Sequence, residues 1–226
     1  MHNFINRTHL KALFVFLFVA GCSDKNPSFY VQGQLIPEEE DGVCVYDVEG
    51  SLLLRGSYNI DFDAPYNLYP VLSNTAVGLT TDISADPNGV VATGASVTLL
   101  NADRTRVNTL DPVTFPNPFF ISTFAFVPSS TDGVVPGRAP GGLPVIPTNY
   151  RQFLGPDRIY IIRVEMSGET LGGTGVDAAP FDWVIDTCNG ACLFDCTQQL
   201  VGGDLAYPCN PGQDIPTGGL GRPICI

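Results

Sequence analysis

The sequence predicts an all-β protein: an antiparallel β-sandwich of immunoglobulin-like type, followed by an irregular, disulfide-linked C-terminal tail. Two observations lead to this fold class. The 226 residues include 24 glycines and 19 prolines, and both residue types interrupt helices, so few uninterrupted runs suit a helix. The segments between them are rich in aromatic and β-branched side chains, which favour strands, and several alternate between apolar and polar positions.

Seven segments are predicted as strands. They are Val43–Asp47, Ser51–Phe62, Tyr66–Thr75, Val90–Leu100, Phe119–Val127, Arg158–Glu169 and Phe181–Cys188. Residues 86–89 form a predicted turn, because Pro87 presets its backbone angle and Gly89 accepts positive φ. Residues 129–149 are rich in proline and glycine and are predicted as a long loop, which we interpret as a surface insertion rather than a functional loop.

The N-terminus carries an export signal. Arg7 and Lys11 precede an apolar run over residues 12–20, which ends at Gly21-Cys22. A basic start, a short apolar stretch and small residues before a break are typical of signal peptides. The cysteine at the break resembles the lipobox of bacterial lipoproteins, which implies cleavage before Cys22 and anchoring by lipid on that residue. The apolar run is too short to span a membrane, which takes roughly 20 residues; a plain secretory signal is the alternative.

This interpretation divides the chain into four regions. They are a lipoprotein signal peptide at 1–21, a lipidated acidic tether at 22–42, the β-sandwich at 43–187 and a Cys-rich tail at 188–226. A short strand at Phe29–Leu35 is allowed within the tether. In enteric lipoproteins, which this N-terminus resembles, an aspartate directly after the lipidated cysteine implies retention at the inner membrane. Here Ser23 occupies that position. The predicted location is therefore the cell envelope, with the protein held by lipid at the outer membrane.

The composition of the processed chain excludes several function classes. His2 and His9 both lie in the signal peptide, so no histidine remains for Ser-His-Asp or Cys-His catalysis. Loss of Arg7 and Lys11 from the 11 basic residues leaves nine against 23 acidic ones, a formal charge of about −14. Such a chain is a poor partner for nucleic acid or for anionic lipid. We predict no enzymatic activity and no cofactor.

Six cysteines remain if lipid occupies Cys22. An even number in an exported protein predicts disulfides. The candidates are Cys44, Cys188, Cys192, Cys196, Cys209 and Cys225. Five of them follow residue 187, so at most one bridge reaches Cys44 and at least two close within the tail; the pairing stays open. A metal site at Cys188, Cys192 and Cys196 is the alternative, weakened by the absence of histidine, and we predict none.

Two segments near the end of the sandwich resemble a known group of proteins. They are residues 170–176, Thr-Leu-Gly-Gly-Thr-Gly-Val, and residues 181–193, which end in Cys-Asn-Gly-Ala-Cys-Leu. They are similar to uncharacterised exported lipoproteins of myxobacterial type, as are residues 56–60 and 66–74. The resemblance covers residues 43–196, departing by one residue between the paired cysteines and by a longer tail. It implies a lipoprotein with a β-sandwich and carries over no activity.

Three functions are left open. The first is a non-enzymatic cell-envelope lipoprotein, a structural or interaction module bound to the membrane by its lipid, with an envelope protein or polysaccharide as partner. The second is a carbohydrate-binding module, which predicts an exposed aromatic row from Phe115, Phe119, Phe120 and Tyr150; Trp183 is expected in the core rather than as a sugar platform. The third is a glycosidase using two carboxylates about 5–10 Å apart. Its candidate pairs are Asp61 with Asp63 and Asp182 with Asp186.

Overall fold

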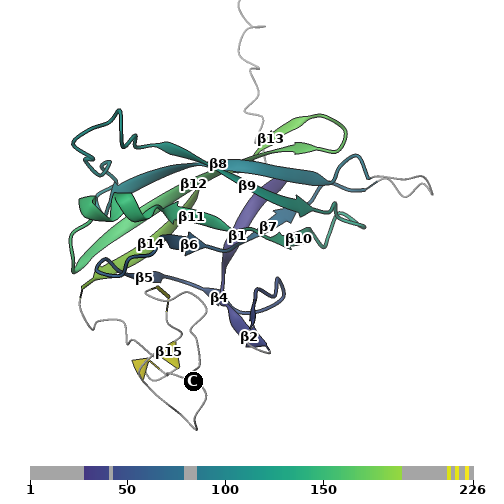
Figure 1. Ribbon diagram of the computed structural model, residues 1–226. Coiled ribbons are helices and arrows are strands. Elements are labelled where there is room, and N and C mark those ends of the chain that lie inside the picture. Colours follow the sequence, from purple (N-terminus) through teal and green to yellow (C-terminus); the bar gives the residue numbers. More distant parts are fainter. Residues whose placement is uncertain are drawn as a thin grey trace, which may run out of the picture.

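The computed structural model describes residues 28–40, 43–78, 86–189 and 213–214, together with the backbone of 217–218 and 222–223. Within these ranges the protein is nearly all β, with one short 3₁₀ helix, η1, at Thr148–Phe153. Most strands belong to two curled sheets that face each other (Figure 1). In the described ranges, no helix has the length and hydropathy needed to cross a membrane.

The larger sheet has the strand order β5-β14-β12-β8-β9, with β13 paired to the end of β12. These strands are β5 Gly56–Asn59, β8 Val90–Asn101, β9 Phe119–Val127, β12 Arg158–Thr170, β13 Gly175–Asp177 and β14 Phe181–Cys188. The long strands β8 and β12 pair in antiparallel register from Tyr160 opposite Asn101 to Thr170 opposite Val90. Only β5, at the edge, runs parallel to its neighbour β14.

The opposite layer is formed by shorter strands. A sheet of order β10-β7-β1-β4 consists of β1 Phe29–Leu35, β4 Leu52–Leu53, β7 Pro70–Asn74 and β10 Gly137–Pro140. A separate pair joins β6 Tyr66–Leu68 and β11 Leu143–Ile146. Two further pairs are β2 Glu38–Glu40 with β3 Val43–Val45, and β15 Thr217–Gly218 with β16 Arg222–Pro223.

One hydrophobic core lies between the two layers. Side chains of β12 that point inward are buried, among them Tyr160, Ile162, Val164 and Met166, and they pack with buried residues of β6, β7 and β11. Trp183 on β14 belongs to the same core with 3% of its surface exposed, which confirms the core assignment for this residue. Burial of these large side chains supplies the main driving force for the fold.

Most of the predicted strands are present. The segments 119–127 and 181–188 match β9 and β14 residue for residue, and 90–100 and 158–169 match β8 and β12 within one residue. The segments 51–62 and 66–75 each divide into two strands. The turn at 86–89 is confirmed by a hydrogen bond from the Gly89 amide to the Asp86 carbonyl, 3.1 Å long.

Two segments differ in part from the sequence analysis. The strand allowed within the tether, Phe29–Leu35, is present with these bounds. It is an interior strand of its sheet, with Leu35 fully buried, so this part of the predicted tether belongs to the folded domain. The expected loop at 129–149 contains β10 and β11, and Leu143 and Ile146 are in the core. Prolines obscured the second pattern, since Pro140 lies on an edge strand, where a missing amide hydrogen is tolerated.

Several sequence predictions concern residues outside the described ranges. Cys22, Cys192, Cys196, Cys209 and Cys225 are among these residues, so the lipid site and the tail bridges stay predictions. Cys44 and Cys188 are both disulfide-bonded, and the pairing itself also stays a prediction. Among the residues described, no three histidine, cysteine or acidic side chains are grouped as a metal site would require.

Candidate functional site

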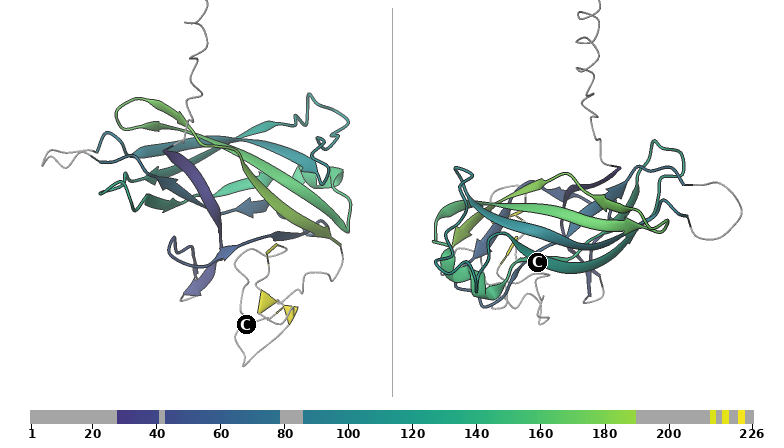
Figure 2. Two further views of the ribbon diagram at one scale, coloured as in Figure 1. Left: turned by 180° about the vertical axis from the view of Figure 1, so that it is seen from behind. Right: turned by 90° about the horizontal axis from the view of Figure 1, so that it is seen from above.

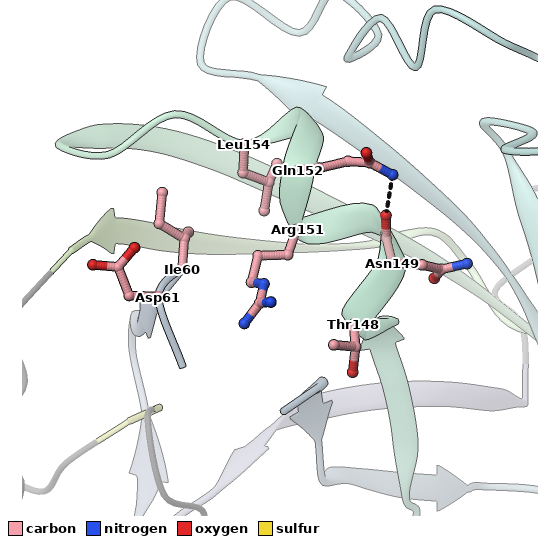
Figure 3. Close-up of a pocket in the computed structure, with 7 residues that line it drawn as sticks. All are labelled: Ile60, Asp61, Thr148, Asn149, Arg151, Gln152 and Leu154. Carbon is pink, nitrogen blue, oxygen red and sulfur yellow. Dashed lines mark hydrogen bonds between the residues drawn. The ribbon is translucent and has the colours of Figure 1, made fainter. Parts of the chain in front are cut away.

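An open groove of about 680 Å³ lies beside η1, at one end of the domain (Figure 3). One wall is η1 and the residue after it, and the other is the turn that follows β5. Its lining residues are Ile60, Asp61, Thr148, Asn149, Arg151, Gln152 and Leu154. The helix is short and begins after Pro147, whose fixed φ suits a helix start. Tyr150 turns inward from it and is buried, which leaves polar side chains toward the groove.

Arg151 is the cation of this groove, and it already has partners. Its guanidinium donates hydrogen bonds to the Phe62 carbonyl and to Asp63, the latter at 3.1 Å. The side-chain amide of Gln152 donates to the Asn149 carbonyl at 2.8 Å (Figure 3). The Arg151 bonds hold the turn after β5 against η1. The groove is therefore lined by both polar and apolar side chains, and its cation is neutralised.

The group beside this turn with a shifted pKa is Tyr58. Burial raises the pKa of Tyr58 to about 12, although the neighbouring Arg151 charge opposes the increase. The phenol stays protonated at neutral pH and donates a hydrogen bond to the Ala64 carbonyl at 2.8 Å. Because a general acid or base works best with a pKa near the operating pH, Tyr58 is poorly suited to proton transfer.

A second polar cluster lies inside the domain, where β5, β6 and β14 meet. The Tyr66 hydroxyl donates to the two carboxylate oxygens of Asp214, at 2.8 and 2.7 Å. The indole Nε1 of Trp183 donates to the Tyr66 oxygen at 2.8 Å, and the Ser57 amide donates to Asp214 at 2.8 Å. Tyr66 is fully buried, and 6% of the Asp214 surface is exposed.

The neighbouring residue, Gln213, fixes the same segment from the other side. Its side-chain amide accepts a hydrogen bond from the Asn67 amide and donates one to the Asn67 carbonyl, both at 2.7 Å. The Asp214 amide in turn donates to the Ser57 carbonyl at 3.0 Å. These two residues of the C-terminal region therefore join β5 in one layer to β6 in the other.

The pKa values of this cluster are strongly shifted. Burial raises the pKa of Asp214 to about 6, against the lowering effect of the bonds from Tyr66 and Ser57. Burial and the Asp214 charge also raise the pKa of Tyr66 well above its ordinary value. Shifts of this kind often mark active sites. Here both groups are enclosed and bonded to one another, so the arrangement stabilises the fold without exposing a reactive group.

Sequence analysis did not find this cluster. Asp214 is a single acidic residue in a region without a strand pattern, and Tyr66, which donates to its carboxylate, is 148 residues away in sequence. The fold alone brings them together.

No protein-family model matches this chain, and a search of curated proteins finds no similar one. Its functional assignment therefore depends on its own geometry.

Three of the four carboxylates predicted for a glycosidase form salt bridges with arginines. Asp182 accepts a bidentate pair of hydrogen bonds from Arg163, at 2.7 and 3.0 Å, and also pairs with Arg104 at 3.2 Å. Asp186 pairs with Arg55, and Asp63 pairs with Arg151. The hydrogen bond from Arg163 lowers the pKa of Asp182, whereas a glycosidase acid needs a raised pKa. Asp61 alone lies in the groove beside η1.

The aromatic row predicted for sugar binding is not formed. Tyr150 is 5% exposed and packs against Phe115 and Phe119, with ring centroids 5.7 and 4.5 Å apart. Of the four predicted residues only Phe120 is well exposed, at 64%. A different set of exposed rings occurs on β9, where Phe124 and Phe126 share the outward face with Phe120. The alternation of phenylalanines within 119–127 was the sequence signal for this set.

Proposed function

We propose that this protein is a non-enzymatic, lipid-anchored protein of the cell envelope, and that its β-domain is a structural or interaction module. The export signal and Cys22 support the anchor and the envelope location. The outer membrane is the proposed site, since Ser23 rather than aspartate follows the cysteine. The partner class is an envelope protein or a polysaccharide.

One observation carries the non-enzymatic part of the proposal. The acid–phenol pair with the most strongly shifted pKa values, Asp214 and Tyr66, is enclosed by Trp183 and Ser57 and has little contact with solvent. A catalytic acid must reach its substrate within hydrogen-bond distance. This pair instead holds the C-terminal region to the two sheets.

The end of the domain at which β1 begins supports a module whose groove beside η1 faces away from the membrane. Phe29 pairs with Asn74, and the Asn74 amide bonds to the Asn88 carbonyl, so β1 begins at the end of the domain that carries the β13 hairpin. The helix η1, which forms one wall of the groove, lies at the other end (Figure 2, left). A lipid on Cys22, six residues before Ser28, would hold the β13 end near the membrane.

We further propose that the two curled sheets are an immunoglobulin-like β-sandwich with a disulfide-linked tail. The shared core between the layers and the disulfide-bonded state of Cys44 and Cys188 support this view. Mass spectrometry of peptides from a non-reduced digest tests it. At least two bridges within 188–226 are expected; free thiols in that region would overturn this part.

Membrane fractionation tests the main proposal. The full-length protein should sediment with the cell envelope and require detergent for release. Cys22→Ala should remove this attachment without affecting the fold, because the residue precedes the first strand. Cys22→Ala protein that stays firmly membrane-bound, or wild-type protein found in the soluble fraction without detergent, would contradict the proposal.

A further inference from the structure

The outer face of the larger sheet carries a hollow of about 410 Å³, separate from the groove beside η1. Its lining includes Ser96 of β8, Phe120 of β9, Glu165 and Ser167 of β12 and Asp177 of β13. The hollow thus spans four neighbouring strands and combines one aromatic ring with hydroxyl and carboxylate groups. Pockets that bind small ligands have volumes in this range.

The strand register explains how these side chains meet. Ser96 is directly opposite both Phe120 and Glu165, so the three side chains form a row on one face of the sheet. On the next row of that face, Gly94 is opposite Ser167, and Ser167 is opposite Asp177. Serines therefore separate the ring at one side from the two carboxylates at the other.

Gly94 creates the depth of this hollow. It offers no side chain, and the tip of the Phe120 ring lies over it: an added Cβ would be only 2.2 Å from the ring carbon Cζ. The register of β8 also shifts between Ala92 and Gly94 against β9, and β12 shifts against β8 at the same level. Such bulges bend a sheet and redirect its side chains.

The hollow offers hydrogen-bond acceptors and an apolar ring. The carboxylates of Glu165 and Asp177 form no hydrogen bond or salt bridge with any other residue that the structure describes, and Glu165 acts on Arg163 only through its charge. The arginines nearest on this face, Arg104 and Arg163, are already paired with Asp182. An anionic ligand would therefore meet two unpaired carboxylates and no available cation.

We infer that this hollow binds a neutral glycan, with Phe120 stacked on the apolar face of a sugar ring and Glu165 and Asp177 accepting hydrogen bonds from its hydroxyls. The C–H groups of a sugar carry partial positive charge and suit the negative face of an aromatic ring. Phe124 and Phe126, 80% and 45% exposed, extend the same face along β9. Six residues of strand cover about 20 Å, which suits a chain of several sugars. This inference rests on the proposed function, whose partner class it specifies.

Binding of defined oligosaccharides to the detergent-solubilised full chain tests the inference. The probes are cellohexaose, maltohexaose and chitohexaose, with hexagalacturonate as the anionic control and glucose as the short control. At least one neutral hexasaccharide should bind in isothermal titration calorimetry, and more tightly than glucose. Phe120→Ala should weaken that binding by about tenfold, and Glu165→Gln by about threefold.

Leu54→Ala is the matched control, since Leu54 is 94% exposed and lies outside the larger sheet, so it should leave binding unchanged. If Phe120→Ala unfolds because it uncovers Gly94, Phe124→Ala and Glu165→Gln decide the question. Failure of all three neutral probes, equal binding of hexagalacturonate, or binding unaffected by these variants would overturn the glycan site. Lipid attachment measured on the same preparations separates this outcome from failure of the proposed envelope function.

Discussion

Tyr66 on β6 and Asp214 in the C-terminal region form a buried hydrogen-bonded pair across 148 residues of sequence. The hydroxyl lies 2.7 and 2.8 Å from the two carboxylate oxygens. The pair ties Asp214 to the interior of the domain, so this residue contributes to the stability of the fold. It also makes that stability depend on pH.

Replacing Asp214 with asparagine should remove this pH dependence. The folded-state pKa of Asp214 is about 6, above its ordinary value of 3.8, so the folded form binds the proton more tightly. The stabilising contribution is therefore complete below about pH 4 and is lost as pH rises through 6. The unfolding free energy of the wild type relative to Asp214→Asn should fall by about 2 kcal/mol between pH 4 and pH 7.

Urea denaturation of both proteins over this pH range measures the difference. Comparing the two cancels the titration of all other carboxylates, which they share. A constant difference between the two unfolding free energies from pH 4 to pH 7 would show that Asp214 is not enclosed as described.

Gly56 leaves space for this cluster, so Gly56→Ala should be strongly destabilising. An added Cβ would lie 2.1 Å from the Tyr66 hydroxyl oxygen and 2.8 Å from Trp183 Nε1. Overpacking of this kind costs about 1–3 kcal/mol or more. Gly175→Ala is the matched control, because an added Cβ there meets no atom within 4 Å. Thermal melts should show a clear decrease in Tm for Gly56→Ala alone; equal Tm values for the two variants would contradict the geometry.

Two aspartates that pair with arginines should differ in their importance for stability. Asp182 accepts two bonds from Arg163, and its side chain is 25% exposed, so Asp182→Asn should cost about 1–2 kcal/mol. The Asp63 side chain is 83% exposed, and Asp63→Asn should change stability by less than about 0.5 kcal/mol. Chemical denaturation of both variants checks this order, and a larger effect for Asp63→Asn would be inconsistent with it.

Local sequence patterns were sufficient for the strands that alternate clearly. Phe119–Val127 and Phe181–Cys188 have the predicted bounds because each carries aromatic and β-branched residues at period two. Gly173, in the hairpin after β12, has a positive φ of 82°, which glycine adopts readily. In each case the deciding information lies within a few residues.

Features that depend on distant partners were not predictable. Phe29–Leu35 was included in a tether because acidic residues follow it, yet pairing with β7 and β4 buries it. Gln213 and Asp214 carry no local pattern, and only their bonds to Asn67, Ser57 and Tyr66 give them a role. The exposed ring of Phe120 and the inward ring of Tyr150 have the same local character in sequence. Phe120 is exposed because it lies on the outward face of β9, whereas Tyr150 turns inward from η1 into the core.

The intact mass of the protein purified from cell envelopes tests the central claim most directly. A lipid-anchored envelope protein requires a chain that begins at Cys22 and carries a diacylglycerol and a fatty acyl group on that residue. A mass equal to residues 22–226 plus these lipids is the predicted result. A mass that retains residues 1–21, or a shortened chain without lipid, would contradict the account.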